Sequence, residues 1–148
     1  MSIKTDAIGK TYPPLVYAVG REKVREFAAA VGETDALYSD VEAARAAGYD
    51  DVVAPPMFAV VYAGASLTPA LFDPEVGIVF AMMVHGRQEF RWGRVVVAGD
   101  EITTTTTVKD IATRGGLGFY VFETESQDRL GATVCTGVWT HIVRGGEE

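Results

Sequence analysis

The sequence holds little cysteine and fewer basic than acidic residues. Cys135 is its single cysteine, which excludes an internal disulfide and a cysteine-based zinc cluster. We expect Cys135 to be a small buried strand residue. Lysine and arginine number 13 against 20 aspartate and glutamate residues, giving a net charge of −7. Because phosphate neutralisation needs clustered basic residues, nucleic acid is not an expected partner.

The motifs of several large enzyme classes are also absent. The sequence has no Ser-His-Asp order, Walker loop or GxGxxG pattern, and we expect no cofactor and no metal. The N-terminal MSIKTDAIGK contains no apolar segment of the kind found in signal peptides, so we expect a cytoplasmic location. No repeat, low-complexity tail or linker interrupts the chain, which favours one domain over residues 1–148.

An uncharged stretch at 52–72, VVAPPMFAVVYAGASLTPALF, is the feature around which the rest is organised. Pro55 and Pro56 suit the start of a helix, and Pro69 marks its other end. The roughly dozen helical residues between them fall short of the ~20 that a bilayer requires, so no membrane span is expected. A helix that is apolar on every face must then be buried in a core. We expect a central helix wrapped by the rest of the chain.

The first third of the sequence predicts short elements before this helix. A strand is expected over 15–19. The segment REKVREFAAAVG at 21–32 has apolar residues at helical spacing and ends at Gly32. Asp40 is a suitable N-cap for a second helix, VEAARAAG at 41–48.

The second half changes to strand patterns. Alternation over 79–92 is followed by segments rich in β-branched residues at 101–112, 119–125 and 132–143, separated by glycine-containing turns. These strands at hairpin spacing predict an antiparallel meander. A helix without a polar face can be hidden only if a curved sheet closes around it, and this combination is the α+β class.

The two histidines lie in this strand region. Strict alternation places His85 on one face with Arg87, Glu89 and Arg91, which predicts a half-solvated strand residue. His141 falls on the face of Trp139 in the last strand and is expected to be structural.

Three segments together resemble a known family. ETDALYSD at 33–40, ARAAGYDDVVAPPMF at 44–58 and HGRQEFRWGRVVVAGDEI at 85–102 resemble the MaoC-like (R)-specific enoyl-thioester hydratases and 3-hydroxyacyl dehydratases. Within that group the chain looks most like the actinobacterial acyl-carrier-protein dehydratase A subunit and small proteins related to it. The resemblance implies a hot-dog fold, which is a curved antiparallel sheet around one central helix, working as a dimer.

The active members of the family carry a loop of the form D-x-N-P-I-H-x-D. Here Glu33, Asp35 and Tyr38 fall at the first Asp, the Asn and the His. A histidine has a pKa near 7 and suits general base catalysis, whereas an unperturbed tyrosine of pKa ~10 is ionised only about one part in a thousand at neutral pH. Glu33, Asp35 and Tyr38 are therefore weak catalytic candidates, and Tyr38 is better suited to line an acyl pocket.

The start of the central helix also departs from the active members, which have the form A-H-G-M there. Pro55 and Pro56 replace the His and the Gly. The resemblance implies that the N–H of this Gly stabilises the enolate oxygen, and proline has no N–H. Met57 and Phe58 could donate only if the thioester docked deeper. Losing one such donor typically costs about 3–4 kcal/mol of transition-state stabilisation.

Three hypotheses follow from these departures. The first is an acyl-thioester-binding subunit of an (R)-3-hydroxyacyl-thioester dehydratase of fatty acid metabolism, which takes an acyl-CoA or acyl-carrier-protein thioester and pairs with a catalytic MaoC-like chain. The second is a self-sufficient (R)-specific enoyl-CoA hydratase homodimer, with Asp35 or Glu33 acting through water and Tyr38 assisting. The third is a non-enzymatic acyl-CoA-binding protein. The expected substrate-binding residues are Tyr38, Pro56, Met57, Phe58 and Tyr62.

Overall fold

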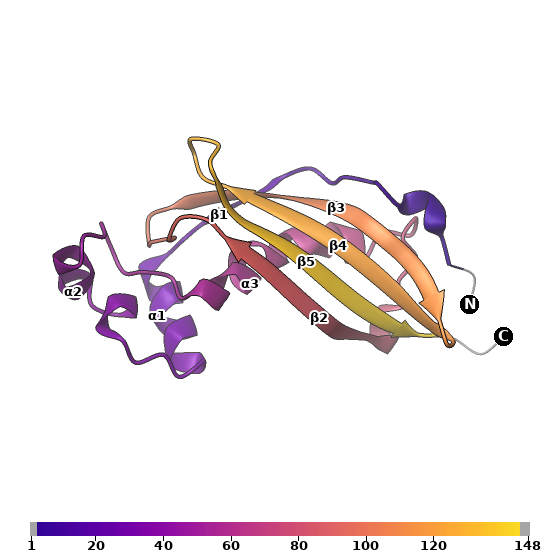
Figure 1. Ribbon diagram of the computed structural model, residues 1–148, viewed down its shortest axis with the longest axis horizontal. Coiled ribbons are helices and arrows are strands. Elements are labelled where there is room, and N and C mark those ends of the chain that lie inside the picture. The colour runs from indigo at the N-terminus through magenta and orange to yellow at the C-terminus, as the bar shows by residue number, and fades with distance from the viewer. Residues whose placement is uncertain (1–2, 146–148) are drawn as a thin grey trace.

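A five-stranded antiparallel sheet with helical segments against one face forms the body of the molecule (Figure 1). The computed structural model describes residues 3–145. The strands are β1 (Leu15–Ala18), β2 (Met83–Trp92), β3 (Glu101–Arg114), β4 (Leu117–Gln127) and β5 (Thr133–Arg144). They lie in the order β1-β3-β4-β5-β2, and each neighbouring pair is antiparallel. The expected α+β class and the meander of the second half are confirmed.

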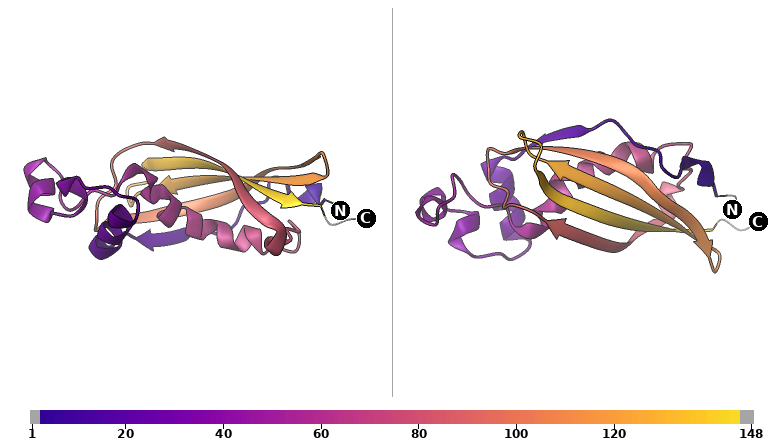
Figure 2. Two further views of the ribbon diagram at one scale, coloured as in Figure 1. Left: turned by 90° about the horizontal axis from the view of Figure 1, so that it is seen from below. Right: turned by 45° about the horizontal axis from the view of Figure 1, so that its top comes forward.

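The helical elements lie at the two ends of the sheet and along one of its faces. They are η1 (Thr5–Ala7), α1 (Arg21–Ala30), η2 (Ala36–Tyr38), α2 (Val41–Ala46), η3 (Pro56–Phe58), α3 (Ala59–Tyr62), η4 (Gly64–Leu67), α4 (Thr68–Leu71) and η5 (Phe80–Met82). The helices α1 and α2 project beyond the end of the sheet where β2 finishes, while the segments from η3 to α4 run along the inner face of the sheet (Figure 2). The segments from η3 to α4 thus form one layer of helix on one layer of sheet.

The central helix is present but interrupted. It runs from Pro56 to Leu71 as four short pieces that alternate between 3-10 and α geometry. Gly64 begins the third piece, and Pro69 lies in the fourth, where it cannot donate a backbone hydrogen bond.

Burial of this helix is one-sided. The side toward the sheet is buried, and its members include Phe58, Ala59, Tyr62, Ala63, Leu67 and Ala70. On the opposite side Met57 is 45% exposed, and Val60 and Val61 are only half-buried. The expected curved sheet around a central helix is confirmed, but the sheet buries one side of that helix and leaves the other side partly exposed.

Buried hydroxyl groups tie the helix to the sheet. Alternation along the threonine run turns Thr104 and Thr106 inward, where both are buried. Thr104 bonds to Ser126 on β4, with 2.7 Å between the hydroxyl oxygens, and Thr106 bonds to Ser66 on η4 at 2.8 Å. Ser66 also donates to the carbonyl of Ala63 at 2.6 Å. These buried polar groups are thus paired, as their burial requires.

A β-bulge changes the face of the sheet on which the first side chains of β2 lie. The register against β5 shifts between His85 and Arg87, so Gly86 is an extra residue in the strand. His85 consequently lies opposite His141, on the inner face, and the prediction that grouped His85 with the charged side chains of β2 is wrong. A Cβ at Gly86 would lie 2.5 Å from Ile142 Cδ1, so glycine suits this position.

Several local predictions are confirmed. Gly32 and Gly48 end α1 and α2 with φ of 75° and 96°, a region that favours glycine. Asp40 caps α2 by accepting the N–H of Glu42 at 2.9 Å. Cys135 is a buried residue of β5, and His141 lies on the inner face with Trp139, as expected.

Candidate functional site

Two cavities flank Pro55 and Pro56 at the start of the central helix. The first, which we call the tyrosine cavity, has a volume of about 400 Å³. Its lining includes Leu37, Tyr38, Tyr49, Tyr62, Trp92 and Val96. The second, the methionine groove, has a volume of about 430 Å³ and is lined by Phe27, Val31, Glu33, Met57 and Val60. Both prolines line both cavities and so form the ridge between them.

Backbone pairing fixes the walls of the tyrosine cavity. The N–H of Ala54 donates to the carbonyl of Val96 at 2.8 Å, and the N–H of Val53 donates to the carbonyl of Leu37 at 2.8 Å. The indole N–H of Trp92 donates to the carbonyl of Pro56 at 2.8 Å and joins the end of β2 to the start of the helix. Three segments distant in sequence are thus held around one apolar space.

The charge of Arg94, which lines this cavity, is already paired. Its Nη1 lies 2.8 Å from Asp100 Oδ2, and its Nε lies 3.0 Å from Asp128 Oδ2. These carboxylates raise the pKa of Arg94, and the guanidinium lowers the pKa of Asp128. Arg94 therefore anchors the loop after β2, and its charge is not available to an anionic ligand.

The three weak catalytic candidates do not lie together. Tyr38 is half-buried in the tyrosine cavity, whereas Glu33 is exposed along the methionine groove. The carboxylate of Asp35 accepts the N–H of Leu37 at 2.9 Å and caps η2. Burial, and then the charges of Glu33 and Asp35, raise the pKa of Tyr38. A raised pKa makes the phenolate rarer, which is the opposite of what a general base needs.

The amides at the helix start are largely used or missing. Pro56 has no N–H, and the N–H of Phe58 donates to the carbonyl of Pro55 at 2.8 Å. Among residues 3–145, the amide of Met57 has no backbone acceptor. The Met57 side chain lines the methionine groove, whereas the Phe58 side chain is fully buried and its ring packs 5.4 Å from the ring of Phe27.

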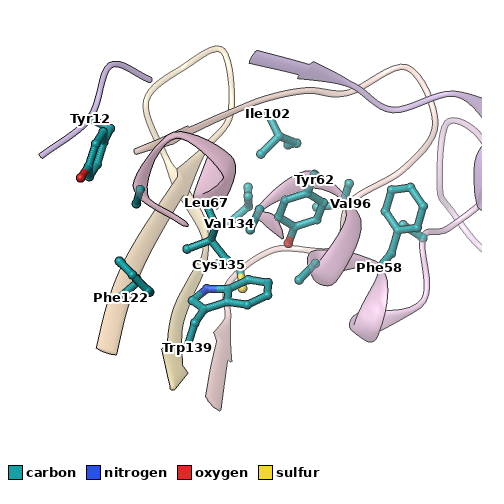
Figure 3. Packing of buried hydrophobic residues seen from close by; sticks show 14 of the residues in the cluster. Tyr12, Phe58, Tyr62, Leu67, Val96, Ile102, Phe122, Val134, Cys135 and Trp139 are labelled. Atoms are coloured by element: carbon teal, nitrogen blue, oxygen red, sulfur yellow. The ribbon is translucent and has the colours of Figure 1, made fainter. Parts of the chain in front are cut away.

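Tyr62 lies deeper, at the end of α3. Its ring borders the tyrosine cavity, and its hydroxyl is directed toward Cys135 and Trp139 (Figure 3). Burial, and then the neighbouring thiol of Cys135, raise the pKa of Tyr62. The phenol is thus a neutral side chain between the cavity and the core.

Sequence reasoning missed a histidine pair outside both cavities. The rings of His85 and His141 lie 4.9 Å apart on the inner face. His141 is 5% exposed, and its Nδ1 has no partner among the described residues. Burial, and then His85, lower the pKa of His141 to about 4. Alternation alone could not reveal the pair, because the bulge at Gly86 reverses the facing of His85.

Residues 3–145 contain no group of three or more His, Cys, Asp or Glu side chains that could hold a metal ion. None of the helices within that range is long and apolar enough to cross a membrane.

Comparisons with known proteins converge on one family. The family model described as FAS1-like, dehydratase domain region, matches residues 6–137. A UPF0336 protein of Clavibacter michiganensis is 47% identical and is matched over 99% of both chains. A truncated HadBC (3R-hydroxyacyl-ACP dehydratase) complex from Mycobacterium tuberculosis contains a chain of 30% identity, with a TM-score of 0.81 over 95% of this chain and 99% of that one. A solved MaoC-like dehydratase has 30% identity and a TM-score of 0.85, and the match covers 95% of this chain but 43% of that longer one.

Proposed function

Since the chain belongs to the FAS1-like dehydratase domain family, we propose that it is the acyl-thioester-binding subunit of an (R)-3-hydroxyacyl-thioester dehydratase. In this proposal the whole chain, residues 1–148, is one hot-dog domain that pairs with a second, catalytic chain. The observation that carries the proposal is the helix start, where a half-buried Tyr38 of raised pKa lies near an imino acid, Pro56. Both line the same cavity, but Tyr38 does not supply a base and Pro56 does not supply an N–H donor.

The chemistry explains why these two positions matter. Removing water from a 3-hydroxyacyl thioester, or adding it back, requires a base, an acid and donors for the enolate oxygen. Within the described residues, the tyrosine cavity is lined by no histidine and no carboxylate. Among residues 3–145, the backbone donor that remains at the helix start is the amide of Met57. Met57 itself lines the methionine groove. What the chain offers is an apolar space for an acyl chain.

A partner surface is available along β2. Within the described residues β2 is the last strand of the sheet, so its outer edge is unpaired, and such an edge is a template for another chain. Exposed apolar side chains lie on β2 and the segments around it: Met57, Phe72, Val79, Phe80, Met82, Val84, Trp92 and Val95. A patch of this kind favours a protein partner. The similar dehydratase chain from M. tuberculosis was solved as part of a complex, which agrees with this arrangement.

The test is hydration of crotonyl-CoA and longer enoyl-CoA thioesters by the purified chain, alone and co-expressed with a candidate MaoC-like partner. We expect the hydration rate of the chain alone to be at least about 100-fold below that of the complex. The reason is that the chain alone lacks both the base and the oxyanion donor. Substantial activity of the chain alone would refute the proposal, and its loss in Tyr38→Phe would then identify a self-sufficient hydratase. Binding without turnover in either format would instead indicate an acyl-CoA-binding protein.

A further inference from the structure

One lining residue of the tyrosine cavity, Tyr62, lies between the cavity and the core. Tyr62 is the last residue of α3, and its side chain is the part of the central helix beyond Pro56 that reaches the cavity. The residue is only 2% exposed, so one side of its ring faces the cavity while the rest is packed in the core. The ring lies 6.2 Å from the ring of Phe58, which is fully buried and does not line the cavity.

Behind Tyr62 the core is filled by closely packed side chains. Cys135 and Trp139 of β5 lie beyond the hydroxyl, at 1% and 4% exposure (Figure 3). Trp139 is held in place because its indole N–H donates to Thr124 at 2.9 Å and its ring packs against Gly64. Two other walls of the cavity are joined by backbone hydrogen bonds, from Val53 to Leu37 and from Ala54 to Val96. Removing the phenol ring would therefore extend the cavity along the helix toward Cys135.

The volume sets the scale of the ligand. At about 400 Å³ the tyrosine cavity is near the lower end of the ~300–1,000 Å³ usual for small-molecule sites. Pro56 and Tyr62 line the same space, so an acyl chain bound there would lie against the Tyr62 ring. The phenol is neutral and faces an apolar space, which suits a wall better than a catalytic group.

We infer that Tyr62 is the specificity-determining residue for acyl length, closing the tyrosine cavity so that the chain takes thioesters of short acyl groups. This inference rests on the proposed function, because it assigns the acyl chain to that cavity. It goes further in naming the substrate class and the residue that selects it.

The test is calorimetric titration of the full-length purified chain with butyryl-CoA, octanoyl-CoA and dodecanoyl-CoA, which are saturated and do not react. For the unsubstituted protein we expect dodecanoyl-CoA to bind no more tightly than butyryl-CoA, although each buried methylene should otherwise strengthen binding about fourfold. In Tyr62→Leu we expect the affinity for dodecanoyl-CoA to rise at least about tenfold, with butyryl-CoA changed less than about threefold. Tyr62→Phe keeps the ring and should leave the length preference unchanged.

Phe58→Leu is the matched control, because it shortens an aromatic side chain of the same helical stretch that does not line the cavity. It should not improve dodecanoyl-CoA binding. An equal gain in Phe58→Leu, or no gain in Tyr62→Leu, would overturn the role of Tyr62 while leaving acyl-thioester binding intact. If none of the three thioesters binds the unsubstituted chain, the proposed function fails together with the inference. Should Tyr62→Leu not fold, Tyr62→Met carries the same expectation, since methionine fills irregular gaps.

Discussion

The protonation of His141 is coupled to folding in the mildly acidic range. Its pKa is about 4 in the folded protein, because burial disfavours the charged ring, against 6.5 for the unperturbed side chain. The unfolded chain therefore binds the proton more readily between these values, and stability falls as the pH drops through that window. At pH 5 this pKa difference lowers the free energy of unfolding by about 2 kcal/mol, since each unit of pKa difference corresponds to about 1.4 kcal/mol.

We predict that His141→Phe flattens the loss of stability between pH 7.5 and pH 5. The substitution removes the titrating ring from a site already lined by Phe122, whose ring lies 5.8 Å from that of His141. Urea unfolding at the two pH values measures the difference. His85→Gln is the control and should keep most of the slope, because burial contributes more than His85 to the pKa shift. An unchanged slope in His141→Phe would assign the pH dependence to other groups.

A second residue-scale prediction concerns Gly93, in the wall of the tyrosine cavity. A Cβ there would lie 2.5 Å from the carbonyl oxygen of Thr133, which is backbone and cannot rotate away. We predict that Gly93→Ala destabilises the fold by about 1–3 kcal/mol, the usual cost of overpacking. Gly20→Ala is the matched control, since a Cβ at Gly20 would meet nothing within 4 Å. Comparable urea midpoints for the two variants would contradict the prediction.

At the scale of elements, the hydroxyl pair of Ser66 and Thr106 joins η4 to β3. We predict that Ser66→Ala and Thr106→Val each cost about 1–2 kcal/mol of unfolding free energy, because each leaves a buried hydroxyl with fewer partners. The double variant should cost less than the sum of the two single ones, since either substitution alone already removes the bond between the two hydroxyls. Chemical denaturation of all four proteins measures this cycle. Strictly additive losses would show that the two hydroxyls do not act together.

The elements also show what sequence reasoning could reach. The apolar run at 52–72 and the glycine-bounded strands identified the helix and the meander, because period and turn residues are local signals. The bulge at Gly86 was not foreseen, since it arises from pairing with β5 and contact with Ile142. Other non-local contacts, with β4 and η4, decide which threonines of the run at 103–107 meet serine partners.

The candidate site was foreseen in part. The run PPMF located the helix start, and the resemblance placed Tyr38 near it; the structure puts Tyr38, Pro56 and Tyr62 around one cavity. That Glu33 and Tyr38 lie on opposite sides of the proline ridge depends on tertiary packing around Pro55 and Pro56, which no local pattern encodes. The fixing of the cavity wall by Arg94 depends likewise on Asp128, a residue 34 positions away.

At the scale of the whole molecule, the one-sided cover of the central helix and the edge of β2, unpaired within residues 3–145, both support the proposed partner. Val84 is 60% exposed on that edge strand. A lysine on an edge strand opposes pairing with another chain, so we predict that Val84→Lys weakens assembly with the catalytic partner at least about tenfold. Leu130→Lys is the matched control, because Leu130 is 94% exposed in the turn between β4 and β5. Analytical ultracentrifugation of the co-expressed proteins compares the assembly of the two variants. Unfolding midpoints of the isolated chains verify that neither substitution acts through stability. Equal assembly of the two variants would place the partner on another surface.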